Sequence, residues 1–155
     1  MGVVVREMKA DEWREWSSMR ATLFETSFED ARVDCEQFIA GEHRDLKVVF
    51  VGVHDSQVIA FAEISERSYV DGCYAGPVAF VEGWSVQQDF QGQGVGRKLV
   101  EAAVGWARKH NYPHLASNVA LDNLNSHKAH VAVGFEEVDR VVQYRMTLRE
   151  AVGET

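Results

Sequence analysis

The chain lacks several features that would place it in a specialised class of protein. It has 155 residues, and no apolar run approaches the roughly 20 residues that a membrane-spanning helix needs. Its first residues show no basic segment followed by an apolar one, so we expect no secretory signal. Cys35 and Cys73 are its two cysteines, and they form no C-x-x-C pair. We therefore expect reduced, partly buried thiols and a cytoplasmic location.

Basic residues are also scarce. The chain has 16 lysines and arginines against 24 aspartates and glutamates, which gives a net charge of −8. Nucleic acids and anionic membranes bind basic surfaces, so we expect neither as a partner. The acidic balance suits a cationic substrate, which the field of the protein attracts, although such a balance can serve solubility alone.

The rest of the composition is that of an ordinary globular protein. Hydrophobic residues make up 46% and charged residues 26%, and the length fits one domain over residues 1–155. Periodicity predicts a mixed α/β protein, in the order strand, two helices, three strands, helix, strand, helix and two strands. The expected helices cover 11–24, 29–39, 97–109 and 123–133. The expected strands cover 3–5, 46–53, 58–64, 78–86, 115–118, 135–139 and 141–148, the last two as a closing hairpin.

One stretch, 78–109, organises this pattern. An apolar strand leads into a loop that holds Gly92, Gly94 and Gly96, and an amphipathic helix follows. A strand, a glycine turn and a helix N-terminus make an anion site, because the first amides of the helix are free and its dipole favours negative charge. Arg97 stands where G-x-G-x-x-G needs its third glycine, and no phosphate-binding G-x-x-x-x-G-K-[ST] is present.

Glu82 is the anomaly of the expected central strand. By simple alternation it shares a face with Val78, Phe80, Trp84 and Val86, and a carboxylate there is costly unless it meets water, a cation or a proton to be moved. An edge strand with Glu82 in solvent is the alternative. Gly83 beside it indicates a β-bulge, whose free N–H groups could pair with an extended amide-containing ligand or hold an oxyanion.

The segment 123–135, N-L-N-S-H-K-A-H-V-A-V-G-F, completes a resemblance. Together with Q-x-x-G-x-G at 91–96, it resembles the GCN5-related N-acetyltransferases (GNAT), in which an Asn opens the last helix and a Gly-Phe ends it. The resemblance implies a GNAT fold, with a mostly antiparallel mixed sheet flanked by helices, and acetyl-CoA as co-substrate. It implies that acetyl-CoA is bound by Trp84, Ser85, Val86, Gln91, Gly92, Gln93, Gly94, Val95, Gly96, Arg97 and Asn123.

The same resemblance suggests two catalytic residues. Glu82 falls where the family has the acidic residue that faces the acceptor amine, so it is the candidate base. His130 stands where the family commonly has a Tyr that protonates the departing thiolate, although a helix-borne His is more often structural. His127 and His130 lie one helical turn apart, but no third ligand accompanies them, so we expect no metal.

The likeness narrows to bacterial aminoglycoside 6'-N-acetyltransferases over nearly the whole chain, through Y-V-D-G-C-Y-A-G-P-V-A-F-V-E-G-W-S-V from Tyr69, W-R-E-W-S-S-M-R-A-T-L-F from Trp13 and G-F-E-E-V-D-R-V-V-Q-Y-R from Gly134. It implies a polycationic amino-sugar acceptor and a homodimer. The substrate-binding residues that we expect are Phe24, Tyr69, Asp71, Glu82, Asn118, Asp122 and Glu136. Asn118 departs from the Asp that relatives often carry, and Asn can neither act as a base nor neutralise an ammonium.

Two other functions remain open from the sequence. A GNAT enzyme could acetylate another amine, such as a polyamine or a protein N-terminus, through the same site. The chain could also be an acyl-CoA sensor without turnover, since it lacks both the Asp and the Tyr.

Overall fold

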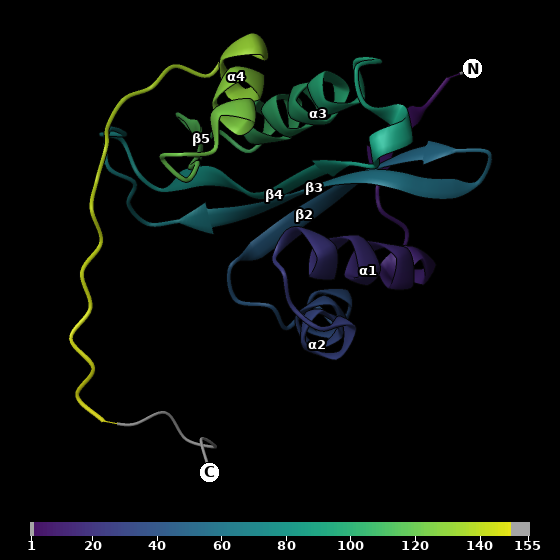
Figure 1. The fold of residues 1–155 in the computed structure, drawn as a ribbon, viewed down its shortest axis with the longest axis horizontal. Coiled ribbons are helices and arrows are strands. Elements are labelled where there is room, and N and C mark those ends of the chain that lie inside the picture. The colour runs from purple at the N-terminus through teal and green to yellow at the C-terminus, as the bar shows by residue number, and fades with distance from the viewer. Residues whose placement is uncertain (1, 150–155) are drawn as a thin grey trace.

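A computed structural model describes residues 2–149 of the chain as one sheet with helices on both of its faces (Figure 1). The elements follow the predicted order as far as the last helix. In chain order they are β1 (Val4–Glu7), a 3-10 turn (Ala10–Glu12), α1 (Trp13–Leu23), α2 (Phe28–Ile39), β2 (Leu46–His54), β3 (Gln57–Arg67), β4 (Val78–Val86), a 3-10 turn (Gln88–Phe90), α3 (Val95–Lys109), β5 (Leu115–Ser117) and α4 (Leu124–Ala132).

The five strands lie in the order β1-β2-β3-β4-β5. The first three pairings are antiparallel and β4 pairs with β5 in parallel, which confirms the mixed, mostly antiparallel sheet. Asp55 and Ser56 turn β2 into β3 with φ values of 48° and 63°, the left-handed conformations that suit a two-residue hairpin turn.

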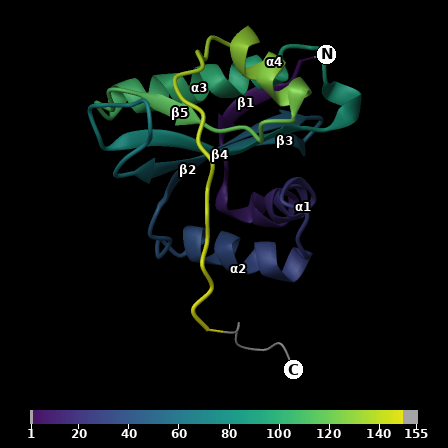
Figure 2. The same ribbon diagram turned by 60° about the vertical axis from the view of Figure 1, so that its left-hand side comes forward.

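Helices α1 and α2 cover one face of the sheet, and α3 and α4 cover the other (Figures 1 and 2). The apolar stripe of α3, which includes Leu99, Ala103 and Ala107, is buried on β2, β3 and β4. On the opposite face, Trp16 and Cys35 pack with Val51 and other strand residues in a second cluster. No helix within residues 2–149 is long and apolar enough to cross a membrane.

Both cysteines are free and buried, as the sequence predicted. They belong to different clusters, Cys35 on the buried side of α2 and Cys73 beside β4. Burial raises the pKa of the Cys35 thiol to about 11, so this group stays an unreactive thiol at neutral pH.

The bulge predicted at Gly83 is present, and it changes which residues share a face with Glu82. The register of β3 on β4 shifts between Glu63↔Gly83 and Ile64↔Val81, so Glu82 is the extra residue. Because a bulge reverses the alternation, Trp84 packs in the cluster under α3 and not beside Glu82. The prediction that Trp84 and Val86 share the face of Glu82 was wrong for this reason.

The closing hairpin predicted at 135–139 and 141–148 does not form. Residues 136–149, here called the C-terminal arm, contain no strand and run away from the body of the protein (Figures 1 and 2). Val142, Tyr144, Met146 and Leu148 alternate along the arm as the sequence suggested, but all four side chains are exposed. The alternation indicates a strand, but within residues 2–149 the arm pairs with no other strand.

Candidate active site

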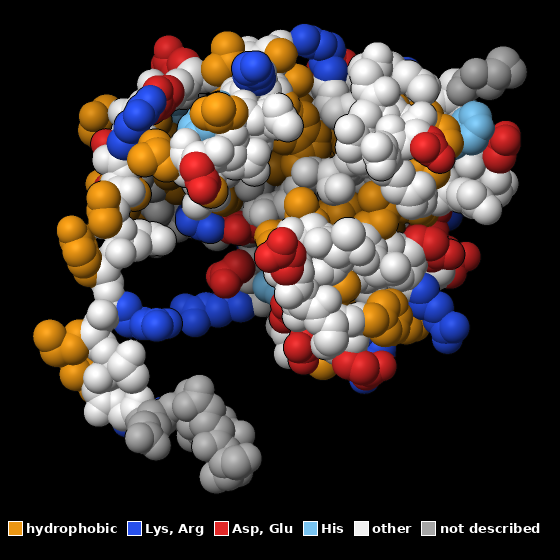
Figure 3. Space-filling view, viewed as in Figure 1, with side chains coloured by type: hydrophobic (Ala, Val, Ile, Leu, Met, Phe, Trp, Pro, Cys, Tyr) orange, Lys and Arg blue, Asp and Glu red, His pale blue; other side chains and the backbone are white. Residues whose placement is uncertain are grey.

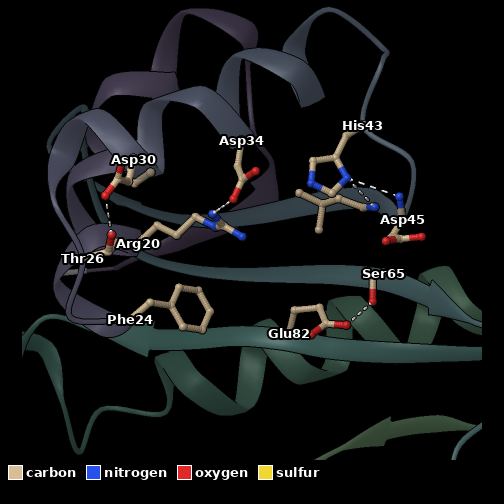
Figure 4. Close-up of a pocket in the computed structure, with 11 residues that line it drawn as sticks. Arg20, Phe24, Thr26, Asp30, Asp34, His43, Asp45, Ser65 and Glu82 are labelled. Atoms are coloured by element: carbon tan, nitrogen blue, oxygen red, sulfur yellow. Dashed lines mark hydrogen bonds and ion pairs between the residues drawn. The ribbon is translucent and has the colours of Figure 1, made fainter. Parts of the chain in front are cut away.

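A cavity of about 440 Å³ opens between the sheet and the layer of α1 and α2. Figure 4 shows its wall, which carries carboxylates from α2, from the loop before β2 and from β4. In the space-filling view, acidic and basic side chains meet at an opening between the two layers (Figure 3). The lining residues are Arg20, Phe24, Thr26, Asp30, Ala31, Asp34, His43, Asp45, Leu46, Ser65 and Glu82.

Glu82 lines this cavity from β4, on the face of the sheet that α1 and α2 cover. Its side chain is 29% exposed and accepts three hydrogen bonds. Ser65 Oγ donates to Oε1 at 2.6 Å, and Arg67 donates from Nε to Oε1 and from Nη2 to Oε2, both at 2.9 Å. The carboxylate is therefore held in one orientation at the cavity wall.

A second glutamate, Glu63 on β3, lies behind the wall with a fully buried side chain. Arg20 Nε donates to both of its oxygens at 3.0 and 2.9 Å, and Arg20 Nη1 donates to Asp34 Oδ2 at 2.8 Å. Burial raises the pKa of Glu63 to about 7, against the opposing effect of Arg20. Although burial opposes it, the carboxylates of Glu63 and Asp34 raise the pKa of Arg20, which stays a cation.

Glu63 also supports the bulge. A Cβ added to Gly83 would lie 2.8 Å from Glu63 Oε1 and 3.1 Å from Phe61 Cε2. This is closer than carbon and oxygen atoms approach, so a side chain at position 83 would require Glu63 to shift. Glu63 therefore packs directly against the bulge that carries Glu82 and Gly83.

Aspartates form the outer wall of the cavity. Asp30 and Asp34 come from α2, and Asp45 comes from the loop before β2. His43 Nδ1 accepts from the backbone N–H groups of Asp45 and Leu46 at 3.2 and 3.1 Å, which fixes that loop. Among these lining groups, Arg20 is the one arginine and its charge is already shared by Glu63 and Asp34. The wall thus carries excess negative charge and suits a cationic ligand.

Phe24, a predicted substrate residue, lines this cavity, and its role in binding stays a prediction. It is the C-cap residue of α1, is 44% exposed and lies with its ring 5.2 Å from the guanidinium carbon of Arg20. It offers an apolar surface opposite Glu82 (Figure 4).

The glycine loop, where the sequence predicts an anion site, follows the end of β4. Gly94 is the N-cap of α3 with φ of 82°, a left-handed conformation that other residues adopt only with strain. The first helical hydrogen bond is donated by Lys98 to Gly94 O, so the amides of Val95, Gly96 and Arg97 precede it without an intrahelical partner. No atom lies within 4 Å of a Cβ added at Gly92 or Gly94, so the loop surface is open.

The side chains of this loop point back onto the protein, which leaves binding to the backbone. Gln91 Nε2 donates to Val86 O at 2.9 Å, and Gln93 Nε2 donates to Asp89 O at 3.4 Å. Arg97 Nη2 donates to Ala132 O at 2.6 Å, which ties α3 to the end of α4. Val95 is buried.

The predicted strand residues Trp84, Ser85 and Val86 lie beyond the end of β5. The β4–β5 pairing stops at Val81↔Ser117, while β4 continues to Val86. Within residues 2–149, the backbone of β4 from the bulge onward therefore has no strand partner on its β5 side, as a ligand that adds like a strand requires, and Gln91 occupies Val86 O at the far end. Trp84 Nε1 donates to Gly96 O at 3.2 Å and joins this strand to the glycine loop.

His130 lies beside this gap, between the rings of Trp84 and Phe135 at 5.2 Å each. Its Nδ1 lies 2.7 Å from Ser126 O and therefore carries the donated hydrogen. Its Nε2 then accepts from Ser117 Oγ at 2.8 Å. The imidazole is thus hydrogen-bonded to a serine at the end of β5.

Asn123 is the N-cap of α4, as the sequence predicted, and its side chain accepts from Ser126 N at 3.2 Å. Asn118 and Asp122 lie between β5 and α4 and are exposed. Neither lines the cavity that contains Glu82.

The structure does not bring the remaining predicted substrate residues to this cavity. Tyr69 and Asp71 are hydrogen-bonded to each other at 3.1 Å in the loop before β4, and Glu136 is the first residue of the exposed C-terminal arm. Their roles in binding stay predictions. No group of three potential metal-ligating side chains occurs within the described residues 2–149.

Sequence reasoning missed Arg20, Asp34, Glu63, Ser65 and Arg67. One signal was available for Glu63, since it is a lone carboxylate in the apolar run V-I-A-F-A-E-I and stands out as Glu82 does. The others lie on ordinary amphipathic segments, and their pairing depends on tertiary contacts.

Comparison with known proteins agrees with this geometry. A family model described as the acetyltransferase (GNAT) family matches residues 6–135. An aminoglycoside N(6')-acetyltransferase type 1 from Klebsiella aerogenes is 37% identical over 147 residues, which cover 94% of this chain and 97% of that protein.

Two solved structures are similar over the whole fold. AAC(6')-Iy in complex with the bisubstrate analogue CoA-S-monomethyl-acetylneamine has a TM-score of 0.86 and 32% identity, over 95% of this chain and 99% of that chain. The 6'-N-acetyltransferase AAC(6')-Ih from Acinetobacter baumannii has a TM-score of 0.86 and 31% identity, over 96% and 100%. These matches confirm the expected fold.

Proposed function

The chain belongs to the acetyltransferase (GNAT) family, and from this premise we propose that it transfers the acetyl group of acetyl-CoA to the 6'-amine of an aminoglycoside antibiotic. One observation carries the proposal. Glu82 stands at the wall of an acidic cavity on the same strand whose unpaired end leads to the amides of the glycine loop. A cationic acceptor and an anionic donor can therefore meet along one strand.

Acetyl-CoA fits the donor side of this arrangement. We propose that its pyrophosphate binds the backbone amides from Gly92 to Arg97, because free amides and the dipole of α3 favour an anion there. Its amide-containing arm would pair with the unpaired edge of β4 at Trp84, Ser85 and Val86. Asn123 would contribute through the N-terminus of α4, beside the same gap.

The acceptor side suits a polycationic amino sugar. Asp30, Asp34 and Asp45 add negative charge around Glu82, and Phe24 offers an apolar surface for a sugar ring. The amine nitrogen must lose a proton before it can attack, and Glu82 is the proposed acceptor of that proton, directly or through a water. Positioning of the two substrates side by side would supply much of the rate.

The proposed step is a direct transfer. The amine nitrogen bonds to the carbonyl carbon of the thioester, and the oxyanion is held by N–H groups of β4 next to the bulge. The C–S bond then breaks, the nitrogen loses its second proton to water, and the thiolate takes a proton. We propose that His130 supplies it through Ser117 once its Nε2 is protonated, since Nε2 and Ser117 Oγ are 2.8 Å apart.

The first experiment is acetyl-CoA-dependent thiol release with kanamycin, which has an amine at the 6' carbon, and with paromomycin, which has a hydroxyl there. Turnover with kanamycin alone supports the proposal, and Glu82→Gln should then abolish most of it. Equal turnover with both would mean that a different amine is acetylated. No thiol release with either antibiotic, together with thiol release with spermidine or a peptide, would favour another amine as acceptor. Acetyl-CoA binding without thiol release from any amine would favour the sensor.

We also propose that residues 1–155 act as one domain and assemble as a homodimer in the cytoplasm. The C-terminal arm supports the dimer, because its alternating apolar side chains are exposed in a single copy and could be covered by a second (Figure 3). The two buried, unpaired thiols are consistent with a reducing compartment.

A further inference from the structure

The hydrogen bonds to Glu82 restrict how this carboxylate can meet a substrate. A carboxylate offers four lone-pair directions, two on each oxygen. Oε1 accepts from Ser65 Oγ and from Arg67 Nε, so both of its directions are filled. Oε2 accepts one bond from Arg67 Nη2. One direction, on Oε2, is left for a ligand.

Arg67 is itself held in place from two sides. It is the last residue of β3, where its backbone pairs with Val78 of β4. Its guanidinium carbon lies 3.6 Å from the centre of the Phe80 ring, and Phe80 is buried. A planar guanidinium stacked on a fixed ring gives a rigid, two-pronged donor, which a lysine cannot reproduce.

The positive charge of Arg67 needs an explanation at a site for a cationic substrate. An arginine next to a site for a cationic substrate repels that substrate, so charge alone would disfavour it. Ser65 and Arg67 project from the same face of β3 as Glu63, two and four residues along. Both donors to Glu82 therefore come from a strand that does not carry it, and they fix its carboxylate across the bulge.

We propose that Arg67 is a positioning residue of this reaction, which clamps Glu82 so that Oε2 alone faces the acceptor amine. This inference rests on the function proposed above. The clamp removes the freedom of a side chain that sits at a bulge, and it leaves a single contact point for the amine. Arg67 acts through Glu82 and has no contact of its own with the acceptor.

Two substitutions test the clamp. Arg67→Met keeps the side-chain stem on Phe80 and removes the guanidinium, while Arg67→Lys keeps the charge and loses the second prong. With kanamycin as acceptor, we expect Arg67→Met to lower kcat/KM by about 10- to 100-fold, as misplacement of a reacting group does. Arg67→Lys should restore part of the loss. The KM for acetyl-CoA should stay unchanged in both.

A double-mutant cycle with Glu82→Ala distinguishes positioning from general damage. Because Arg67 acts through Glu82, Arg67→Met should cause no further loss in the Glu82→Ala background. The cycle is measured in kcat/KM. It is also measured in the affinity for kanamycin, by calorimetry with CoA present, because this affinity can be determined even when turnover is low. Arg32→Met is the matched control, since Arg32 pairs with Glu29 and Glu36 on exposed α2 and should leave every parameter unchanged.

Three results would overturn the inference. The first is tighter kanamycin binding in Arg67→Met, which would mean that repulsion is the main effect of Arg67. The second is a loss of kcat/KM from Arg67→Met that persists in the Glu82→Ala background. The third is a raised KM for acetyl-CoA. Retention of full turnover by Glu82→Ala itself would instead overturn the role of Glu82 in the proposed function. The two failures are therefore distinguishable.

Discussion

Glu63 and Glu82 are both lone carboxylates in apolar strands, yet their surroundings give them different chemistry. Glu82 meets the cavity and is held by donors from β3, whereas Glu63 is buried with Arg20 as its partner. Burial favours the neutral form of an acid, and it raises the pKa of Glu63 to about 7. Glu63 therefore binds a proton more tightly in the folded state than in the unfolded state.

This difference predicts how stability depends on pH. The pKa of Glu63 is about 7 in the folded protein and 4.5 in its reference state. Its protonation stabilises the fold below pH 4.5, and this contribution is lost as pH rises toward 7. We expect it to amount to on the order of 3 kcal/mol or less. Glu63→Gln, measured by urea unfolding at several pH values across this window, should remove that downward slope.

The control for this prediction is Glu36→Gln on the exposed side of α2, where the carboxylate pairs with Arg32 at the surface. It should leave the slope of the wild type intact. An unchanged slope in Glu63→Gln would show that Glu63 remains ionised throughout, with Arg20 overcoming the effect of burial.

At the scale of elements, the backbone conformation at the junction of the glycine loop with α3 sets the direction of the amides that are proposed to bind acetyl-CoA. Gly94 is the N-cap in a left-handed conformation, and the amides that follow it form the proposed anion site. A side chain at this position strains the backbone that aims those amides.

We expect Gly94→Ala to weaken acetyl-CoA binding. Loss of one hydrogen bond to a charged group costs about 1.5–3 kcal/mol, so the KM for acetyl-CoA should rise about 10-fold or more. Stability should fall by about 1 kcal/mol, because Ala is strained at positive φ. Steady-state kinetics with varied acetyl-CoA and thermal unfolding measure the two effects.

Gly105 offers the matched control within the same helix. It lies in mid-helix, exposed, with no atom within 4 Å of an added Cβ. Gly105→Ala should raise stability by about 0.5–1 kcal/mol and leave the KM for acetyl-CoA as it was. An equal rise of KM in both variants would contradict a specific role for the loop.

At the scale of the molecule, the C-terminal arm leaves an apolar surface uncovered. Tyr144, Met146 and Leu148 are more than four-fifths exposed at 92%, 83% and 88%, and they alternate with Gln143, Arg145 and Thr147. A segment with one apolar edge gains stability only when another surface covers it. A second copy of the chain is the proposed cover.

The proposed role of the arm in the dimer can be tested by substitutions on its apolar edge. We expect the wild type to show twice the 17.4 kDa of one chain by size exclusion with light scattering. Tyr144→Asp with Met146→Asp should weaken the dimer by at least about 100-fold, because each buried side chain of this size contributes about 1.5–3 kcal/mol. Gln143→Asp with Thr147→Asp adds the same charge on the polar edge and should not. A monomeric wild type would exclude the homodimer.

Much of the fold and part of the site follow from the sequence by itself. The hydrophobic periods of 3.6 and 2 residues, the turn at Asp55 and the glycine loop are local properties of the sequence. The α-helices and strands up to α4 could therefore be predicted, whereas the two 3-10 turns were not. Gly83 beside Glu82 indicated the bulge because both residues conflict with a regular apolar strand.

Only the tertiary structure decided how these elements meet. The bulge reversed the face of Trp84, and strand register set Ser65 and Arg67 on Glu82 across 17 and 15 residues of chain. Arg20 reaches Glu63 across 43 residues, which no local pattern encodes. The alternation in the C-terminal arm is local, but a strand needs a partner, and within residues 2–149 the arm pairs with none. Sequence specifies which segments can form, and packing between distant segments specifies what each side chain faces.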